Sequence, residues 1–183
     1  IIFTKAMTSL IGPNDAIDVS IDPTDSVDYE GELGVIISKT ARRVAKADWQ
    51  DYVFGYVIIN DVTSRELQKK HNQWTIGKGL DTFGPMGPYI VTKDEIDDLS
   101  SMQIQTLVNN EVRQQAEVRD LIFDIPTLIE TLTLTGTLLA GDVIATGTPV
   151  GVGIGFNPPK FLKSGDVVTI NVTGLGSLTN PVI

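Results

Sequence analysis

Short apolar runs, separated by glycine, proline, aspartate and asparagine, alternate with polar residues along most of this chain. Runs of this length with such boundaries are typical of β-strands. The segments that fit a strand are residues 29–38, 53–60, 102–108, 111–118, 142–146 and 167–172. Asn109-Asn110 lies between two of these segments and residues 163–166 precede the last one, so both predict tight turns.

Two further segments show helical signals. Thr63-Ser64-Arg65-Glu66 matches a capping box, which predicts a helix capped by Thr63 and running to about Lys70. A second helix is predicted after Asp124, a suitable N-cap, because apolar residues then recur at helical spacing. These residues are Ile125, Leu128, Ile129 and Leu132. Strands outnumber helices, and the alternation typical of a doubly wound sheet is missing, so the prediction is a mainly β fold with a few short helices.

Length, charge and composition narrow the class of protein. The 183 residues suit one domain with a sizeable core, and we expect a single domain over residues 1–183. A formal net charge of −9 argues against nucleic acid or an anionic membrane as a partner. The chain has no cysteine, which excludes disulfides and thiolate chemistry, and no apolar run as long as a membrane span. A cytoplasmic location is therefore expected.

Three carboxylates are the strongest candidates for a functional site in this sequence. Glu30 and Glu32 are two residues apart, so on a strand both side chains lie on one face. Asp61 follows the predicted strand at 53–60, and if the two strands are neighbours the three acids converge. At about 4 Å and an effective dielectric constant of about 20, each like-charge pair costs about 4 kcal/mol. Either carboxylate protonation or a hard divalent cation relieves this repulsion, and the cation is the simpler answer.

Other candidate residues follow closely in the sequence. Arg65 and Gln68 are three apart and share a face of the predicted helix, which suits either a binding site or an ordinary solvated surface. Lys78 lies in the glycine- and proline-rich segment 74–88, which is typical of a functional loop or of a plain surface loop. A second such segment, residues 146–155, lacks the spacing of a dinucleotide-binding loop.

A series of motifs extends over nearly the whole chain. They are Phe3-x-Lys5, Asp28-Tyr29-Glu30-Gly31-Glu32-Leu33, Gly55-Tyr56 with Asn60-Asp61, Arg65-Glu66-Leu67-Gln68, Gly77-Lys78-x-x-Asp81-Thr82-Phe83-x-Pro85-x-Gly87-Pro88, Ile122-Phe123-x-Ile125-Pro126, and Gly141-Asp142-Val143-Ile144-Ala145-Thr146-Gly147-Thr148-Pro149. In content and order they resemble the fumarylacetoacetate hydrolase family, in its small prokaryotic-type branch.

The resemblance implies a fold, an assembly and a set of site residues. The implied fold is a mixed β-roll of the family's C-terminal domain type, and the implied assembly is a homodimer. The implied cofactor is Mg²⁺, or Mn²⁺ in its place, bound by Glu30, Glu32 and Asp61. The implied catalytic residues are Lys78, Arg65 and Gln68, and the implied contacts to a bound 2-oxo acid are Arg65, Gln68, Lys78 and Thr148.

The resemblance also implies cleavage of a C–C bond in a small 2-oxo acid through a metal-stabilised enolate. This reaction is hydrolysis of an acylpyruvate or fumarylpyruvate, or decarboxylation of oxaloacetate. The alternatives are a 2-hydroxyhepta-2,4-diene-1,7-dioate isomerase, a sugar-acid dehydratase, and a metal-binding scaffold without catalysis. The family's catalytic histidine lies in a segment upstream of Phe3 that is not in this sequence, and His71 does not match it. An upstream segment with the general base is therefore expected.

Overall fold

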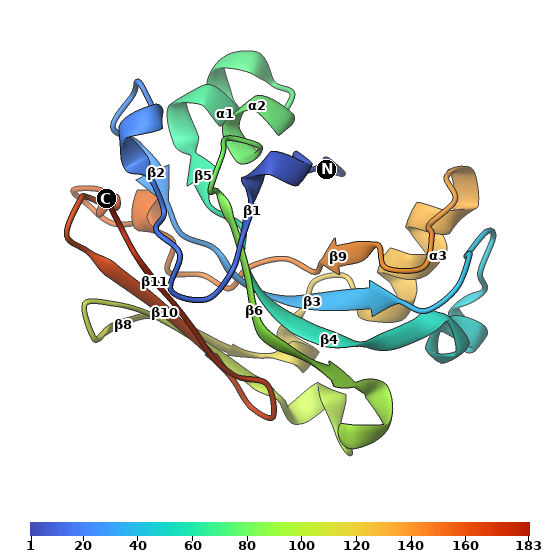
Figure 1. Cartoon of the computed structure of the whole chain (residues 1–183). Coiled ribbons are helices and arrows are strands. Elements are labelled where there is room, and N and C mark those ends of the chain that lie inside the picture. Colours follow the sequence, from blue (N-terminus) through green and yellow to red (C-terminus); the bar gives the residue numbers. More distant parts are fainter.

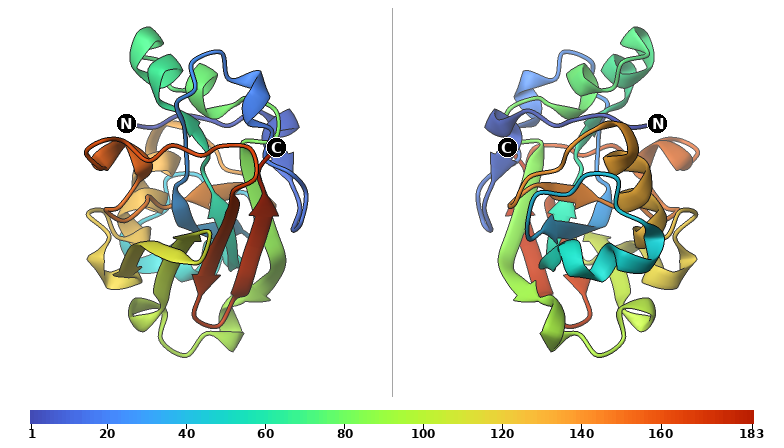
Figure 2. Two further views of the ribbon diagram at one scale, coloured as in Figure 1. Left: turned by 90° about the vertical axis from the view of Figure 1, so that its left-hand side faces the viewer. Right: turned by 90° about the vertical axis from the view of Figure 1, so that its right-hand side faces the viewer.

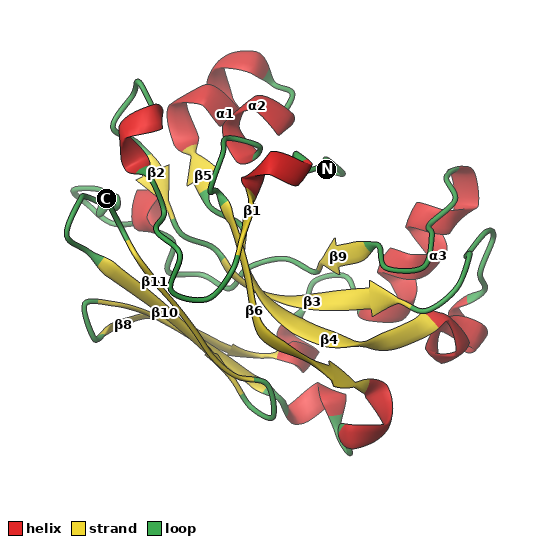
Figure 3. Cartoon of the chain, in the orientation of Figure 1, coloured by secondary structure: helices red, strands yellow, loops and turns green.

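The computed structural model describes residues 1–183 and consists mainly of β-strands (Figure 1, Figure 3). The strands are β1 (Leu10–Ile11), β2 (Val27–Asp28), β3 (Gly31–Ile37), β4 (Val53–Asn60), β5 (Thr63–Ser64), β6 (Gly84–Thr92), β7 (Gln103–Val108), β8 (Glu111–Glu117), β9 (Val143–Ala145), β10 (Val167–Val172) and β11 (Gly176–Pro181). The α-helices are α1 (Arg65–His71), α2 (Thr75–Lys78) and α3 (Ile125–Thr135). Short 3₁₀ helices are Met7–Ser9, Val19–Ile21, Lys46–Tyr52, Lys93–Glu95, Leu99–Ser101, Val118–Asp120 and Gly153–Gly155. The predicted mainly β fold with a few short helices is confirmed.

Two sheets carry most of the strands. One sheet has the order β1-β6-β4-β3-β9, the other has the order β11-β10-β7-β8, and β2 pairs separately with β5. β1 and β6 are parallel, whereas the other paired strands are antiparallel. Figure 1 shows the two sheets as two layers, with α3 and the 3₁₀ helix Lys46–Tyr52 at the right-hand end, and the right-hand view of Figure 2 shows these two helices from that end. No helix has both the length and the apolar character needed to cross a membrane.

The core lies between the two sheets and isolates the central strands from water. It contains 27 buried apolar residues, which come from both sheets, from α3 and from connecting segments. Complete burial of an aliphatic side chain of this kind contributes about 1.5–3 kcal/mol. All seven residues of β3 are buried, and in its neighbour β4 only Phe54 is exposed. Polar groups at the ends of these strands therefore need partners from the protein or from a ligand.

The six strands predicted from the sequence are all present, and β4 and β10 have the predicted bounds. The turn at Asn109 and Asn110 is also confirmed, since both residues have positive φ angles of 51° and 67°. The structure corrects the prediction for segment 74–88, because the first half of β6 lies in this segment, which was predicted to be a loop. Glycine and proline disfavour strands locally, but pairing with β1 on one side and β4 on the other overrides that preference.

The helix predictions were right in one case and partly wrong in the other. Asp124 caps α3 as predicted, because its Oδ1 accepts a hydrogen bond from the Thr127 N–H at 2.9 Å. The predicted capping box before α1 is wrong: Thr63 belongs to β5, and Ser64 is the N-cap residue. The Thr63 hydroxyl donates to the Asp61 carbonyl at 2.9 Å, so it does not cap the helix.

Candidate metal centre and substrate site

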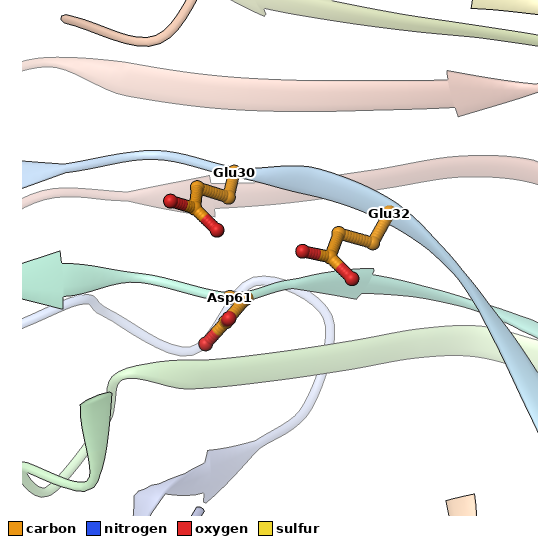
Figure 4. A group of neighbouring side chains, drawn as sticks. All are labelled: Glu30, Glu32 and Asp61. Atoms are coloured by element: carbon orange, nitrogen blue, oxygen red, sulfur yellow. The ribbon is translucent and has the colours of Figure 1, made fainter. Parts of the chain in front are cut away.

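Glu30, Glu32 and Asp61 come together because β3 and β4 are neighbouring antiparallel strands. Gly31 pairs with Asn60 across these strands, and the Asp61 N–H donates to the Glu30 carbonyl at 2.8 Å. One carboxylate oxygen from each of the three buried acids lies within 4.8 Å of the others. Figure 4 shows the three side chains gathered in one place, with Glu30 and Glu32 extending to the side on which Asp61 lies. The prediction that two separate acidic stretches meet is confirmed.

Each of these carboxylates has one oxygen held by a donor from another part of the chain. The donors are a guanidinium, a backbone N–H and an ammonium group. The contacts are Arg65 Nη1 to Glu30 Oε1 at 2.6 Å, Gly147 N to Glu32 Oε2 at 2.7 Å, and Lys5 Nζ to Asp61 Oδ1 at 2.7 Å. Such contacts fix the orientation of each carboxylate through only one of its two oxygens.

Lys78, the last residue of α2, lies at the centre of the acidic group. Its Nζ donates to Glu30 Oε2 at 2.8 Å and to Asp61 Oδ2 at 2.7 Å, and the residue is only 1% exposed. The backbone carbonyl of Lys78 accepts a hydrogen bond from Lys5 Nζ. The Lys78 backbone is therefore tied to the same site as its side chain.

The charges in this site are not fully balanced. Glu30, Glu32, Asp61 and Asp28 carry four negative charges when ionised, against three positive charges on Lys5, Arg65 and Lys78. Burial, reinforced by the negative charges of Asp61 and Glu30, raises the pKa of Glu32 to about 8. At neutral pH and without a further cation, Glu32 therefore tends to keep a proton.

The donor set fits a hard divalent cation. Three carboxylates offer only oxygen ligands, which Mg²⁺ and Mn²⁺ prefer, and no cysteine or histidine takes part. Each acid has one oxygen that is not committed to its orienting donor. Glu30, Glu32 and Asp61 are thus placed where they could hold a metal ion together, and their assignment as ligands stays a prediction.

Arg65 and Gln68, the predicted substrate-binding residues on α1, lie next to the acids. Arg65 Nε donates to Asp28 Oδ2 at 2.8 Å, and its Nη1 donates to Gln68 Oε1 at 3.3 Å. Burial alone lowers the pKa of Arg65, but the carboxylates of Glu30 and Asp28 more than offset this and raise it. Arg65 Nη2 is buried without a hydrogen-bond partner. A buried guanidinium donor of this kind suits an anionic group of a ligand.

Thr148, the fourth predicted contact, lies on the loop that follows β9. Its hydroxyl donates to the Gly31 carbonyl at 3.0 Å and accepts from Gln114 Nε2 at 2.7 Å. Gln114 Oε1 in turn accepts from the Gly31 N–H at 3.0 Å. Thr148 is therefore held against the residue that separates Glu30 from Glu32.

The sequence interpretation assigned no role to three residues that build this site: Lys5, Asp28 and Gln114. Asp28 accepts hydrogen bonds from the backbone of Gly153 at 2.6 Å and of Ile154 at 2.9 Å, in addition to its contact with Arg65. An acid next to a buried strand was a usable signal for Asp28. Gln114 gave none, because β8 carries polar residues on both faces.

The fold and this site together define a protein class, and comparison with known proteins identifies the family. The model described as "Fumarylacetoacetate (FAA) hydrolase C-terminal" matches residues 1–183. The chain belongs to this family, which confirms the resemblance seen in the motifs.

Three individual proteins illustrate the relationship. The chain is 50% identical over 181 residues to oxaloacetate tautomerase YisK of Bacillus subtilis (strain 168), covering 99% of this chain and 60% of that protein. It is 47% identical, with a TM-score of 0.96, to the structure of a fumarylacetoacetate hydrolase from Exiguobacterium antarcticum, covering 100% of this chain and 65% of the other. A 2-hydroxyhepta-2,4-diene-1,7-dioate isomerase from Mycobacterium marinum matches at 41% identity and a TM-score of 0.90, over 100% and 68% of the two chains. The chain thus spans about 60% of its curated relative.

Proposed function

We propose that this protein is a divalent-metal-dependent enzyme that forms the enolate of a small 2-oxo acid. Oxaloacetate is the first candidate substrate, and keto–enol tautomerisation is the first candidate reaction. The observation that carries this proposal is the convergence of three buried carboxylates with Lys78 and with an unpartnered guanidinium N–H of Arg65. The similarity to an oxaloacetate tautomerase supports the choice of substrate and reaction.

Glu30, Glu32 and Asp61 would hold Mg²⁺ or Mn²⁺, which as a Lewis acid withdraws electrons from the 2-oxo group of a bound substrate. Lys78 places a positive charge beside these carboxylates, close to the oxygen on which negative charge develops as C3 loses a proton. Arg65 Nη2 is available to the substrate carboxylate, and Gln68 keeps its amide nitrogen as a donor because its Oε1 faces Arg65.

Thr148 offers the substrate mainly an acceptor. Its hydroxyl hydrogen already bonds the Gly31 carbonyl, so donating to a substrate would break that contact. Thr148 and Gln114 together also keep the loop after β9 in place beside Glu30 and Glu32. We assign Thr148 to substrate positioning, whereas Lys78, Arg65 and Gln68 contact the reacting part of the molecule.

C–C bond cleavage, the reaction predicted from the sequence, is the second candidate. The similarity to a protein named as a hydrolase favours it. Both reactions form the enolate of a 2-oxo acid: C3 deprotonation gives the enolate of the intact substrate, and bond cleavage gives the enolate of the pyruvate product. Isomerisation and sugar-acid dehydration are further alternatives, and similarity to a protein named as an isomerase supports the first of them.

The experiment that separates these reactions follows two products in one assay. The full-length protein is incubated with Mg²⁺ and oxaloacetate, while the ultraviolet absorbance of the enol and the concentration of pyruvate are both recorded. A faster approach to the keto–enol equilibrium without pyruvate supports tautomerisation, whereas metal-dependent release of pyruvate supports cleavage. Absence of any metal-dependent change with oxaloacetate, acetylpyruvate, a 2-hydroxydienedioate and sugar acids would leave only the metal-binding scaffold.

The charge on Lys78 is tested in the same assay. Lys78→Met is expected to lower turnover by about 100-fold, the typical effect of removing one donor that stabilises a developing oxyanion. Lys163→Met is the matched control, because Lys163 is exposed in the turn before β10. Full turnover in Lys78→Met would contradict the proposed role.

The assembly and location are proposed from family membership. We propose a homodimer in the cytoplasm, with a small 2-oxo acid as partner and no nucleic acid or membrane partner. The net charge of −9 supports the last point, because it repels polyanions. Analytical ultracentrifugation of the full-length protein tests the dimer, and a monomer at micromolar concentration would contradict it.

A further inference from the structure

The six oxygens of the three acids divide into two groups of three. One oxygen of each acid is held by its orienting donor, namely Arg65, the Gly147 N–H or Lys5. Of the other three oxygens, Lys78 Nζ binds two, Glu30 Oε2 and Asp61 Oδ2. The oxygens left for a metal ion are therefore largely those that the lysine now occupies.

We propose that Lys78 and the divalent cation compete for Glu30 Oε2 and Asp61 Oδ2, so that Lys78 is the counter-ion of the metal-free site and is displaced when the ion binds. This inference rests on the proposed function, because it assumes that the three acids form the metal site. It goes further in giving Lys78 two successive positions, one before and one after metal binding. Only in the second is its ammonium group free to face a substrate oxygen.

The backbone of Lys78 is held by contacts that do not involve its own side chain. The backbone N–H of Lys78 donates to the Trp74 carbonyl at 2.9 Å, and its carbonyl accepts from Lys5 Nζ. The ammonium group carries three N–H donors and lies at the end of a flexible four-carbon side chain. The ring of Phe3, 5.1 Å from Nζ, provides a favourable face for the ammonium group beside the carboxylates.

Lys5 differs from Lys78 although both are cations bonded to Asp61. Lys5 Nζ binds Oδ1 and also the carbonyl oxygens of Val62 and Lys78, so it has three acceptors, and its two backbone acceptors do not depend on the metal. All the acceptors of Lys78 Nζ are carboxylate oxygens of the candidate metal site. Competition therefore concerns Lys78, whereas Lys5 orients Asp61 in both states.

The test is isothermal titration of Mn²⁺ into metal-stripped full-length protein. Lys78→Met is expected to bind Mn²⁺ at least tenfold more tightly than the wild type, whereas Lys5→Met is expected to bind it no more tightly. Lys163→Met, an exposed lysine, controls for the change in net charge and should lie within twofold of the wild type.

Each of the other outcomes contradicts either the proposed competition or the proposed metal site. Binding in the wild type with equal or weaker binding in Lys78→Met overturns the competition and leaves the proposed metal site intact. Equal tightening in Lys5→Met and Lys78→Met also overturns it, since a general field effect then explains both. Absence of Mn²⁺ binding in every protein overturns the proposed metal site, and the competition with it.

A second measurement uses only the wild type, in case Lys78→Met does not fold. A crystal structure of the wild-type protein with Mn²⁺ is expected to show Lys78 Nζ no longer hydrogen-bonded to both Glu30 Oε2 and Asp61 Oδ2. Retention of both hydrogen bonds with the ion in place overturns the inference.

Discussion

Asp61 combines two roles in this site, as a partner of two ammonium groups and as a neighbour of two other carboxylates. Its side chain accepts hydrogen bonds from two ammonium groups, Lys5 on Oδ1 and Lys78 on Oδ2, and it lies within reach of Glu30 and Glu32. Asp61→Asn keeps the shape but removes the charge and replaces one acceptor oxygen with a donor. We expect Mg²⁺ affinity to fall by more than about tenfold, and activity to fall with it, as measured by calorimetry and turnover. Unchanged activity at limiting Mg²⁺ would remove Asp61 from the ligand set.

The raised pKa of Glu32 predicts how the stability of the metal-free protein changes with pH. Its pKa in the folded protein is raised to about 8 by burial and by the charges of Asp61 and Glu30, from an ordinary value of 4.5. The folded state therefore binds a proton that the unfolded state releases between these values, and its stability falls as pH rises from about 4.5 to 8. Thermal unfolding in a chelator at pH 5 and pH 8 measures this slope.

Glu32→Gln is the matched variant for that measurement. The amide keeps an acceptor oxygen for the Gly147 N–H but cannot ionise, so the fall in stability between pH 5 and pH 8 should become smaller. The same fall in both proteins would assign the pH dependence to another group.

At the scale of elements, α3 is the part of the fold whose start is best explained by local sequence. Asp124 caps it through the Thr127 N–H, and Thr127 hydrogen bonds lower the pKa of Asp124. Asp124→Ala is expected to destabilise the protein by about 1 kcal/mol in urea unfolding, the usual cost of losing an N-cap. Activity should be unchanged, because α3 contributes no residue to the site. The ionised cap contributes its full stabilisation above the ordinary pKa of 3.8, and this part is lost as pH falls through the lowered pKa of the folded state, so the difference between the two proteins should shrink in strong acid.

The elements of the site differ in how far sequence predicts them. β3 and β4 are apolar runs with clear boundaries, so both strands were predicted from local pattern. Their pairing, on which the meeting of Glu30, Glu32 and Asp61 depends, entered the prediction only as a condition, and the structure meets it. β6 and α2 were not predicted, because the glycines and prolines of segment 74–88 conceal both. Pairing with β4 stabilises β6, and no local sequence pattern indicates α2. The position of Lys78 therefore came from the family motif, not from a predicted element.

At the scale of the molecule, the site joins residues that are far apart in sequence. Lys5 contacts Asp61, 56 positions away, and the Gly147 N–H contacts Glu32, 115 positions away. The roles of Lys5 and Gln114 depend on these long-range contacts, and no periodicity reveals them. The candidate metal site is thus a property of the assembled sheets, and an ion bound there is expected to stabilise the whole fold.

Metal binding is therefore expected to raise the unfolding temperature of the full-length protein. An ion that binds only the folded state at 100 times its dissociation constant stabilises that state by about 2.7 kcal/mol. For a domain of this size each kcal/mol shifts the midpoint by about 2–4 °C, which predicts a rise of roughly 5–10 °C with saturating Mg²⁺ over a chelator control. Scanning calorimetry measures this shift, and Asp61→Asn at the same Mg²⁺ concentration should show less than half of it. An equal rise in the variant would mean that the stabilising ion binds elsewhere, because a cation held between β3 and β4 needs the carboxylate at the end of β4.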